Sequence, residues 1–78
     1  MARITPLGSA GGSISSKLGM CAGLCMAYKL DFRLDYDAAT DEWNACFGRI
    51  FEGKRYYDNR SLDELLDLLI DEIADYTD

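Results

Sequence analysis

Residues 61–78 carry seven acidic side chains and no basic one. Four of them, Asp63, Asp67, Asp71 and Asp75, recur every four residues, and this spacing places side chains on one face of an α-helix. The remaining three are Glu64, Glu72 and Asp78. A row of carboxylates without basic neighbours is suited to binding cationic groups on another molecule.

This row of acids opposes the stability of the helix that carries it. Each like-charge pair four residues apart costs about 0.2–0.5 kcal/mol, and acids near a helix C-terminus also oppose the helix dipole. Acidic faces favour solubility, which is one explanation of the pattern. The absence of any Lys or Arg after Arg60 favours a second, that the helix faces a basic macromolecular surface. Such a row imitates the charges of a phosphate backbone.

Residue types that support catalysis are scarce in this sequence. It contains no histidine, which is the commonest general base and metal ligand. Its glycine-rich stretch is not followed by the Lys-Ser/Thr pair of a phosphate-binding loop. Cys21, Cys25 and Cys46 make an odd number, which favours small buried residues in a reducing compartment over disulfides or a zinc site. We therefore expect no catalytic residue, no cofactor and no metal.

A basic and aromatic cluster, Lys54–Tyr57, precedes the acidic segment. Such clusters bind single-stranded nucleic acid in some proteins, but the net charge of −6 opposes phosphate. We favour a strand whose Lys54 and Arg55 pair with the acidic helix. Tyr56 and Tyr57 join the candidate partner-binding residues, which are Asp63, Glu64, Asp67, Asp71, Glu72, Asp75, Tyr56 and Tyr57.

The overall charge and hydropathy also restrict the partners. Residues 1–60 are nearly neutral, so the acidic segment carries the whole charge imbalance, which argues against direct binding to nucleic acid or to an anionic membrane. The apolar stretch 19–27 is too short to span a bilayer. We expect a cytoplasmic protein, monomeric or homodimeric, because an open sheet edge allows pairing.

The elements that must position these residues follow from periodicity. Residues 61 to about 75 predict a helix that starts with the capping-box pair Ser61 and Glu64. Residues 29–37 alternate apolar and charged side chains, which predicts a strand with one solvated face. A hairpin loop at 38–42, a second strand at 43–51, a turn at Glu52-Gly53 and a third strand at 54–58 follow. The predicted apolar side of the second strand is Trp43, Ala45, Phe47 and Phe51.

Residues 14–28 are ambiguous between a helix and a buried strand, and we favour a short helix capped by Ser13 or Ser15. Its predicted core stripe is Ile14, Leu18, Cys21, Cys25 and Tyr28, with Gly19 and Gly23 packed closely inside the domain. Residues 1–13 predict a flexible lead or one short strand, and 14–78 a single domain. The predicted fold class is α+β: a small antiparallel sheet of two or three strands, packed by the acidic C-terminal helix and a short N-terminal helix.

This layout over residues 29–78, a small α+β chain with an acidic surface and no catalytic residues, resembles phage-encoded anti-CRISPR proteins in general character. The resemblance implies a non-enzymatic inhibitor that blocks the basic nucleic-acid channel of a CRISPR effector, a protein or ribonucleoprotein complex, in the cytoplasm of a bacterial host. The resemblance also implies that nucleic-acid phosphates are imitated by the carboxylates of Asp63, Asp67, Asp71 and Asp75.

A second resemblance rests on KLDFRLDYDAATDEWNACF followed by SLDELLDLLIDEI, which is similar to the hairpin and helix of HicB antitoxins. The Pro-Asp-Leu-Pro-Gly-Cys-like stretch of that family is not found after the second strand. This resemblance implies an antitoxin or immunity protein that neutralises a basic toxin.

Overall fold

A computed structural model describes residues 13–77 of the chain. Its elements, in chain order, are α1 (Ile14–Ala27), β1 (Asp31–Asp37), β2 (Glu42–Arg49), the short 3-10 helix η1 (Ile50–Glu52), β3 (Gly53–Asn59) and α2 (Leu62–Thr77). The lead predicted for residues 1–13 lies outside the described part, apart from Ser13.

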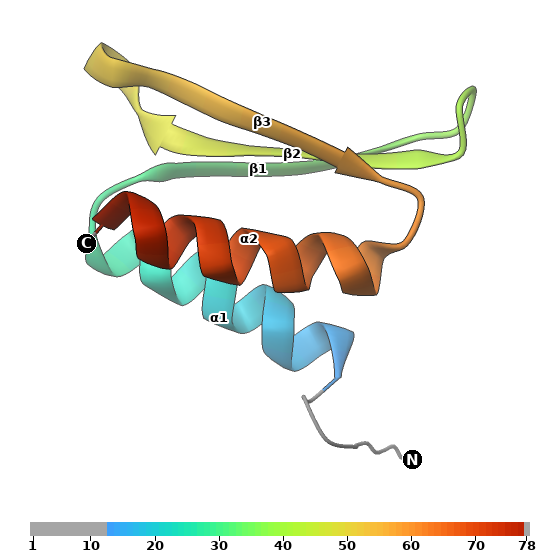
Figure 1. Ribbon diagram of the computed structural model, residues 1–78, viewed down its shortest axis with the longest axis horizontal. Coiled ribbons are helices and arrows are strands. Elements are labelled where there is room, and N and C mark those ends of the chain that lie inside the picture. Colours follow the sequence, from blue (N-terminus) through green and yellow to red (C-terminus); the bar gives the residue numbers. More distant parts are fainter. Residues whose placement is uncertain (1–12, 78) are drawn as a thin grey trace.

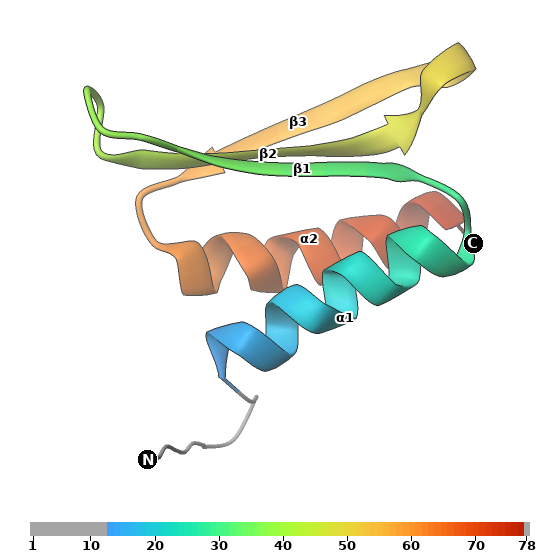
Figure 2. The same ribbon diagram turned by 180° about the vertical axis from the view of Figure 1, so that it is seen from behind.

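The three strands form one antiparallel sheet in the order β1-β2-β3. Both helices lie on the same face of this sheet, and they run in the same direction (Figures 1 and 2). The α+β prediction is therefore confirmed, including the N-terminal helix and a sheet covered on one side only, and the sheet has three of the two or three strands expected. The open face of the sheet carries the charged residues of the alternating strand pattern.

The core lies between the sheet and the helix layer. Phe47, at the centre of β2, is fully buried, with Tyr57 stacked at 5.8 Å and Tyr76 edge-on at 5.5 Å between ring centroids. The register places Phe47 opposite Phe32 and Ala45 opposite Leu34, so the apolar side chains of β1 and β2 meet on the helix side. The buried cluster consists of Cys21, Cys25, Leu30, Ala45, Phe47, Leu65, Leu66, Leu69 and Ile73.

The ambiguous segment is the helix α1, capped by the side chain of Ser13, which accepts a hydrogen bond from the Ser16 N–H at 3.1 Å. Its predicted core stripe was wrong at three positions, since Ile14, Leu18 and Tyr28 are exposed. Cys21 and Cys25 are buried as predicted, and the third buried residue of α1 is Lys17. Lys17, whose ammonium is ion-paired with α2, thus takes the buried place that the prediction gave to Leu18.

The predicted close packing of Gly19 and Gly23 was also wrong. Both glycines are exposed, and a Cβ atom added to either would meet nothing within 4 Å. The described part of the chain therefore does not require glycine at these two positions.

The second strand ends earlier than its sequence pattern predicts. β2 stops at Arg49, and the chain turns through η1 into Gly53, whose φ of 81° suits glycine. Phe51 consequently leaves the row of Trp43, Ala45 and Phe47 and is 99% exposed. The strand prediction failed here because a 3-10 turn replaced the expected two-residue turn at Glu52-Gly53.

The C-terminal helix begins as predicted. The Ser61 hydroxyl accepts a hydrogen bond from the Glu64 N–H at 3.2 Å, and the Ser61 carbonyl accepts one from the Leu65 N–H at 3.0 Å. The Ser61 N–H instead donates to the Asn59 side chain at 2.8 Å. The helix start is thus fixed by two neighbouring side chains rather than by the full reciprocal capping box.

Candidate functional site

The apolar side of α2 decides where its acidic residues lie. Leu65, Leu66, Leu69 and Ile73 are fully buried against the sheet and α1. A helix that buries this stripe must direct its carboxylates sideways or outward. They divide into a group beside α1, a group beside β3 and a group facing away from the body.

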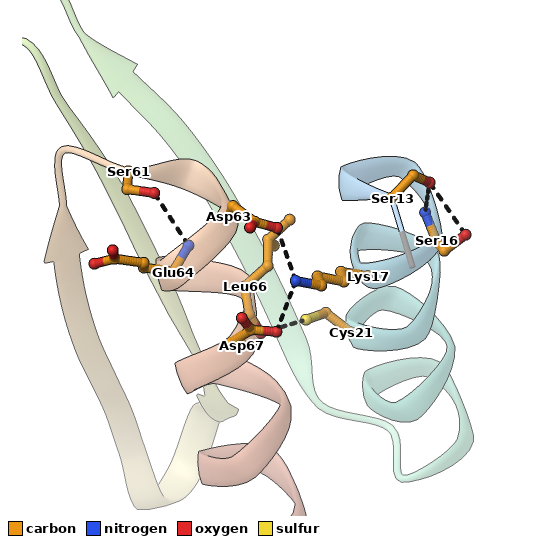
Figure 3. A network of polar contacts seen from close by, with 9 residues as sticks. All are labelled: Ser13, Ser16, Lys17, Cys21, Ser61, Asp63, Glu64, Leu66 and Asp67. Carbon is orange, nitrogen blue, oxygen red and sulfur yellow. Dashed lines mark hydrogen bonds and ion pairs between the residues drawn. The ribbon is translucent and has the colours of Figure 1, made fainter. Parts of the chain in front are cut away.

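Lys17 of α1 binds the first group. Its Nζ lies 2.8 Å from Oδ1 of Asp63 and 3.0 Å from Oδ1 of Asp67, as Figure 3 shows. Lys17 is 8% exposed, and hydrogen bonds from its ammonium to Asp63 and Asp67 raise the pKa of Lys17 above its usual value. One cation thus bridges two carboxylates that would otherwise repel each other.

Sequence reasoning missed this role of Lys17. The available signal was that Lys17 is the one charged residue of the segment that became α1. A single charge in an otherwise uncharged helix beside an acidic helix favours an ion pair between the two.

Arg55 of β3 lies beside the second group. Its Nη1 is 3.8 Å from Glu72 and 3.9 Å from Asp75, and its guanidinium lies over the ring of Tyr76. Tyr57 donates a hydrogen bond to Glu72 at 2.9 Å. Burial and this hydrogen bond raise the pKa of Tyr57. The prediction that the basic strand pairs with the acidic helix is confirmed for Arg55, whereas Lys54 pairs with Asp31 at 3.6 Å.

The third group consists of Glu64 and Asp71, which are exposed and form no ion pair within residues 13–77. Asp67 of the first group and Asp75 of the second group border the same outward side of α2, and their side chains are 59% and 76% exposed. We call Glu64, Asp67, Asp71 and Asp75 the acidic ridge. Asp78 lies outside the described residues.

The eight candidate residues do not form one surface. Tyr56 lies on the open face of the sheet, in one row with its register partner Cys46 and with Arg33, the partner of Cys46 on β1. It is 75% exposed. Tyr57, the next residue of β3, faces the helices. Period-two alternation separates the two tyrosines, so Tyr56 cannot share a partner surface with the acidic ridge.

Residues 13–77 contain no group of three histidine, cysteine or carboxylate side chains placed to hold a metal ion. The three cysteines are free and buried, as the interpretation of small buried residues predicted. Neither of the two described helices is long and apolar enough to cross a membrane.

The sequence matches no protein-family model, and comparisons with curated proteins and with solved structures find no match. The fold and the site therefore define the class of this protein only by their own features: a small α+β domain with an acidic helical ridge.

Proposed function

We propose that this chain is a non-enzymatic inhibitor that binds a basic, nucleic-acid-binding surface of a partner through the acidic ridge, in the manner of anti-CRISPR proteins. The observation that carries the proposal is the placement of the cations. Lys17 and Arg55 lie at the two flanks of α2, and no basic side chain of residues 62–77 interrupts the ridge. A partner would therefore meet a row of four carboxylates, two of which, Asp67 and Asp75, have a cation on their inner side.

The charge density of the ridge supports mimicry of one nucleic-acid strand. Glu64 and Asp75 are eleven residues apart, so the ridge extends over about 17 Å at about 1.5 Å per residue. One strand of DNA carries about five phosphates over the same length. Four carboxylates approach that density closely enough to compete for a row of Lys and Arg side chains.

The proposed partner is a protein or ribonucleoprotein with a basic channel, such as a CRISPR effector in the cytoplasm of a bacterial host. Direct contact with nucleic acid is disfavoured by like charge. Among the candidate residues, Glu72 and Tyr57 bind each other, so we assign them to the scaffold rather than to the contact surface.

The test is an affinity pull-down of the tagged protein from a bacterial lysate that contains CRISPR effectors, washed at low and at high salt. We expect a nucleic-acid-handling complex that stays bound at low salt, is released at high salt and loses DNA binding when the protein is added. Glu64→Lys combined with Asp71→Lys should weaken this binding at least tenfold. Each new lysine would face the basic surface of the partner, and like charges placed opposite each other at an interface cost several kcal/mol. Asp67 is left unchanged because reversing it would oppose Lys17.

The matched control is Asp35→Lys combined with Glu42→Lys, which changes the net charge equally on the open sheet face. The ridge is not the site if the ridge variant binds at full strength. The same conclusion follows if the control variant loses binding and the ridge variant does not. Rescue of growth from a cognate toxin, without binding to any nucleic-acid-handling complex, would assign the chain to the antitoxin class instead.

A further inference from the structure

The open face of the sheet contains a hollow with a volume of about 420 Å³, on the side away from the helices. Its floor is formed by Asn44 and Cys46 of β2, which are short side chains on the central strand. Longer side chains on the two edge strands form its walls: Arg33 and Asp35 on β1, and Lys54, Tyr56 and Asp58 on β3. This volume is in the range of sites that hold small ligands. We call it the sheet hollow.

Most polar groups in the sheet hollow lack partners within residues 13–77. The side chains of Arg33, Asp35, Asn44, Tyr56 and Asp58 form no hydrogen bond or ion pair there, whereas Lys54, which also lines the hollow, pairs with Asp31. Cys46, at the floor, is 8% exposed and its thiol is likewise unpaired. A concave surface on which a few polar groups converge is the usual form of a small-ligand site.

The strand register sorts these groups into two rows. Asp35 and Asp58 lie on either side of Asn44, and Arg33 and Tyr56 lie on either side of Cys46. Adjacent rows on one face of an antiparallel strand are about 6.8 Å apart. The hollow therefore has an oxygen-lined end and, about 7 Å along β2, an end with a guanidinium.

We propose that the sheet hollow binds the C-terminal arginine of a peptide or protein. The guanidinium of the ligand lies between Asp35 and Asp58, its free carboxylate pairs with Arg33, and its aliphatic stem crosses Cys46 beside Tyr56. Six bonds of about 1.5 Å, extended as a zigzag, separate the carboxylate carbon of an arginine from its guanidinium carbon by about 7 Å. That length matches the spacing of the two rows.

Arginine suits the oxygen-lined end better than lysine does. The strands that carry Asp35 and Asp58 are separated by β2 and are about 9.6 Å apart, twice the spacing between neighbouring strands. A planar guanidinium has donors on both of its sides and can reach both carboxylates, whereas a compact ammonium reaches one. Two unpaired carboxylates and one unpaired guanidinium also complement a ligand with a cationic side chain and a single anionic terminus.

The test is an NMR titration of the full chain with the tripeptide Gly-Gly-Arg bearing a free carboxylate. We expect shifts confined to β1, β2 and β3 around the hollow. Amidation of the tripeptide carboxylate should weaken binding about tenfold, and Asp58→Asn should do so as well, since hydrogen bonds to charged groups have about that effect. Arg33→Gln should remove the preference for the free carboxylate over the amide, a readout that a merely structural role of Arg33 would not change.

The matched control is Glu42→Gln, which removes an acid from the same sheet face one row beyond Asp35, outside the hollow. It should leave the affinity unchanged. Bound tripeptide should also slow the modification of Cys46 by a small thiol reagent, while Cys21 and Cys25, in the core, serve as unreactive internal references. Equal affinity for the amidated tripeptide, or an unchanged affinity in Asp58→Asn, would overturn the proposal.

Discussion

At the scale of single residues, Lys17 and Arg55 supply the positive charge that α2 lacks. Lys17 bridges Asp63 and Asp67, and Arg55 lies beside Glu72 and Asp75. Because the cations come from neighbouring elements, they also hold the helices and the sheet together. The acids of α2 that contact them thus have a structural role that a row of like charges on a helix does not suggest.

Cys21 should make the fold sensitive to alkali. It is fully buried, and desolvation raises the pKa of its thiol from 9.0 to about 11. Between these values the unfolded chain loses the proton first, so the free energy of unfolding falls as pH rises. For Cys21 we expect a loss of about 2 kcal/mol between about pH 8 and pH 10.5, which urea denaturation under reducing conditions would measure.

Cys21→Ala removes this titration and should flatten the alkaline loss by a similar amount. Lys17, Cys25 and Tyr57 also have raised pKa values and act in the same direction, so part of the loss should persist in the variant. If the variant loses as much stability as the parent between the two pH values, burial of the Cys21 thiol is not a source of the alkaline sensitivity.

At the scale of elements, α1 is less stable as a helix than it could be. Gly19 and Gly23 lie in its interior, where glycine costs about 0.5–1 kcal/mol relative to alanine. Nothing in the described chain occupies the space where their Cβ atoms would lie. The stability of α1 therefore comes from its cap, its two buried cysteines and its ion pair with α2.

Replacing both glycines, Gly19→Ala with Gly23→Ala, should raise the free energy of unfolding by about 1–2 kcal/mol in urea denaturation. Gly48→Ala is the contrasting variant, because its φ is 148° and its Cβ would lie 2.7 Å from the carbonyl oxygen of Gly53. That change should lower the free energy by about 1–3 kcal/mol. If the double variant in α1 is less stable than the parent, the fold requires glycine at positions 19 and 23.

At the scale of the whole molecule, the acidic ridge and the sheet hollow belong to opposite layers. The helices cover one face of the sheet (Figures 1 and 2). The residues that line the hollow lie on the other face. Charges separated by more than a Debye length, about 10 Å at 0.1 M salt, interact weakly in water. The two surfaces should therefore bind their ligands independently.

This independence can be measured directly. Glu64→Lys with Asp71→Lys should leave the affinity for Gly-Gly-Arg within about twofold of the parent, because distant sites are close to additive. Asp58→Asn should leave retention of the nucleic-acid-handling partner unchanged. A loss of both activities in either variant would indicate one shared interface or a change of fold, and far-UV circular dichroism distinguishes these two outcomes.

Periodicity was enough to predict much of the fold. The alternation Leu30, Phe32, Leu34 and the stripe Leu65, Leu66, Leu69, Ile73 identified β1 and α2, because burial of one face dictates the period of each element. Phe51 was misplaced because the extent of a strand depends on the turn that follows it. Of the candidate site, the sequence predicted that α2 carries the acids, but it did not predict which of them are exposed.

The sequence by itself determined the α+β class, the acidic character of α2 and the charged alternation on the open sheet face, since these depend on residue type and local spacing. The tertiary structure decided that Lys17 neutralises one flank of α2 and that Arg55, without Lys54, lies at the other. It also decided that Glu64 replaces Asp63 in the outward row and that unpaired groups of three strands meet in a hollow. Those outcomes depend on which elements become neighbours. Residues far apart in the chain, such as Lys17 and Asp63, are brought together by packing of the shared core, and no local pattern encodes that contact.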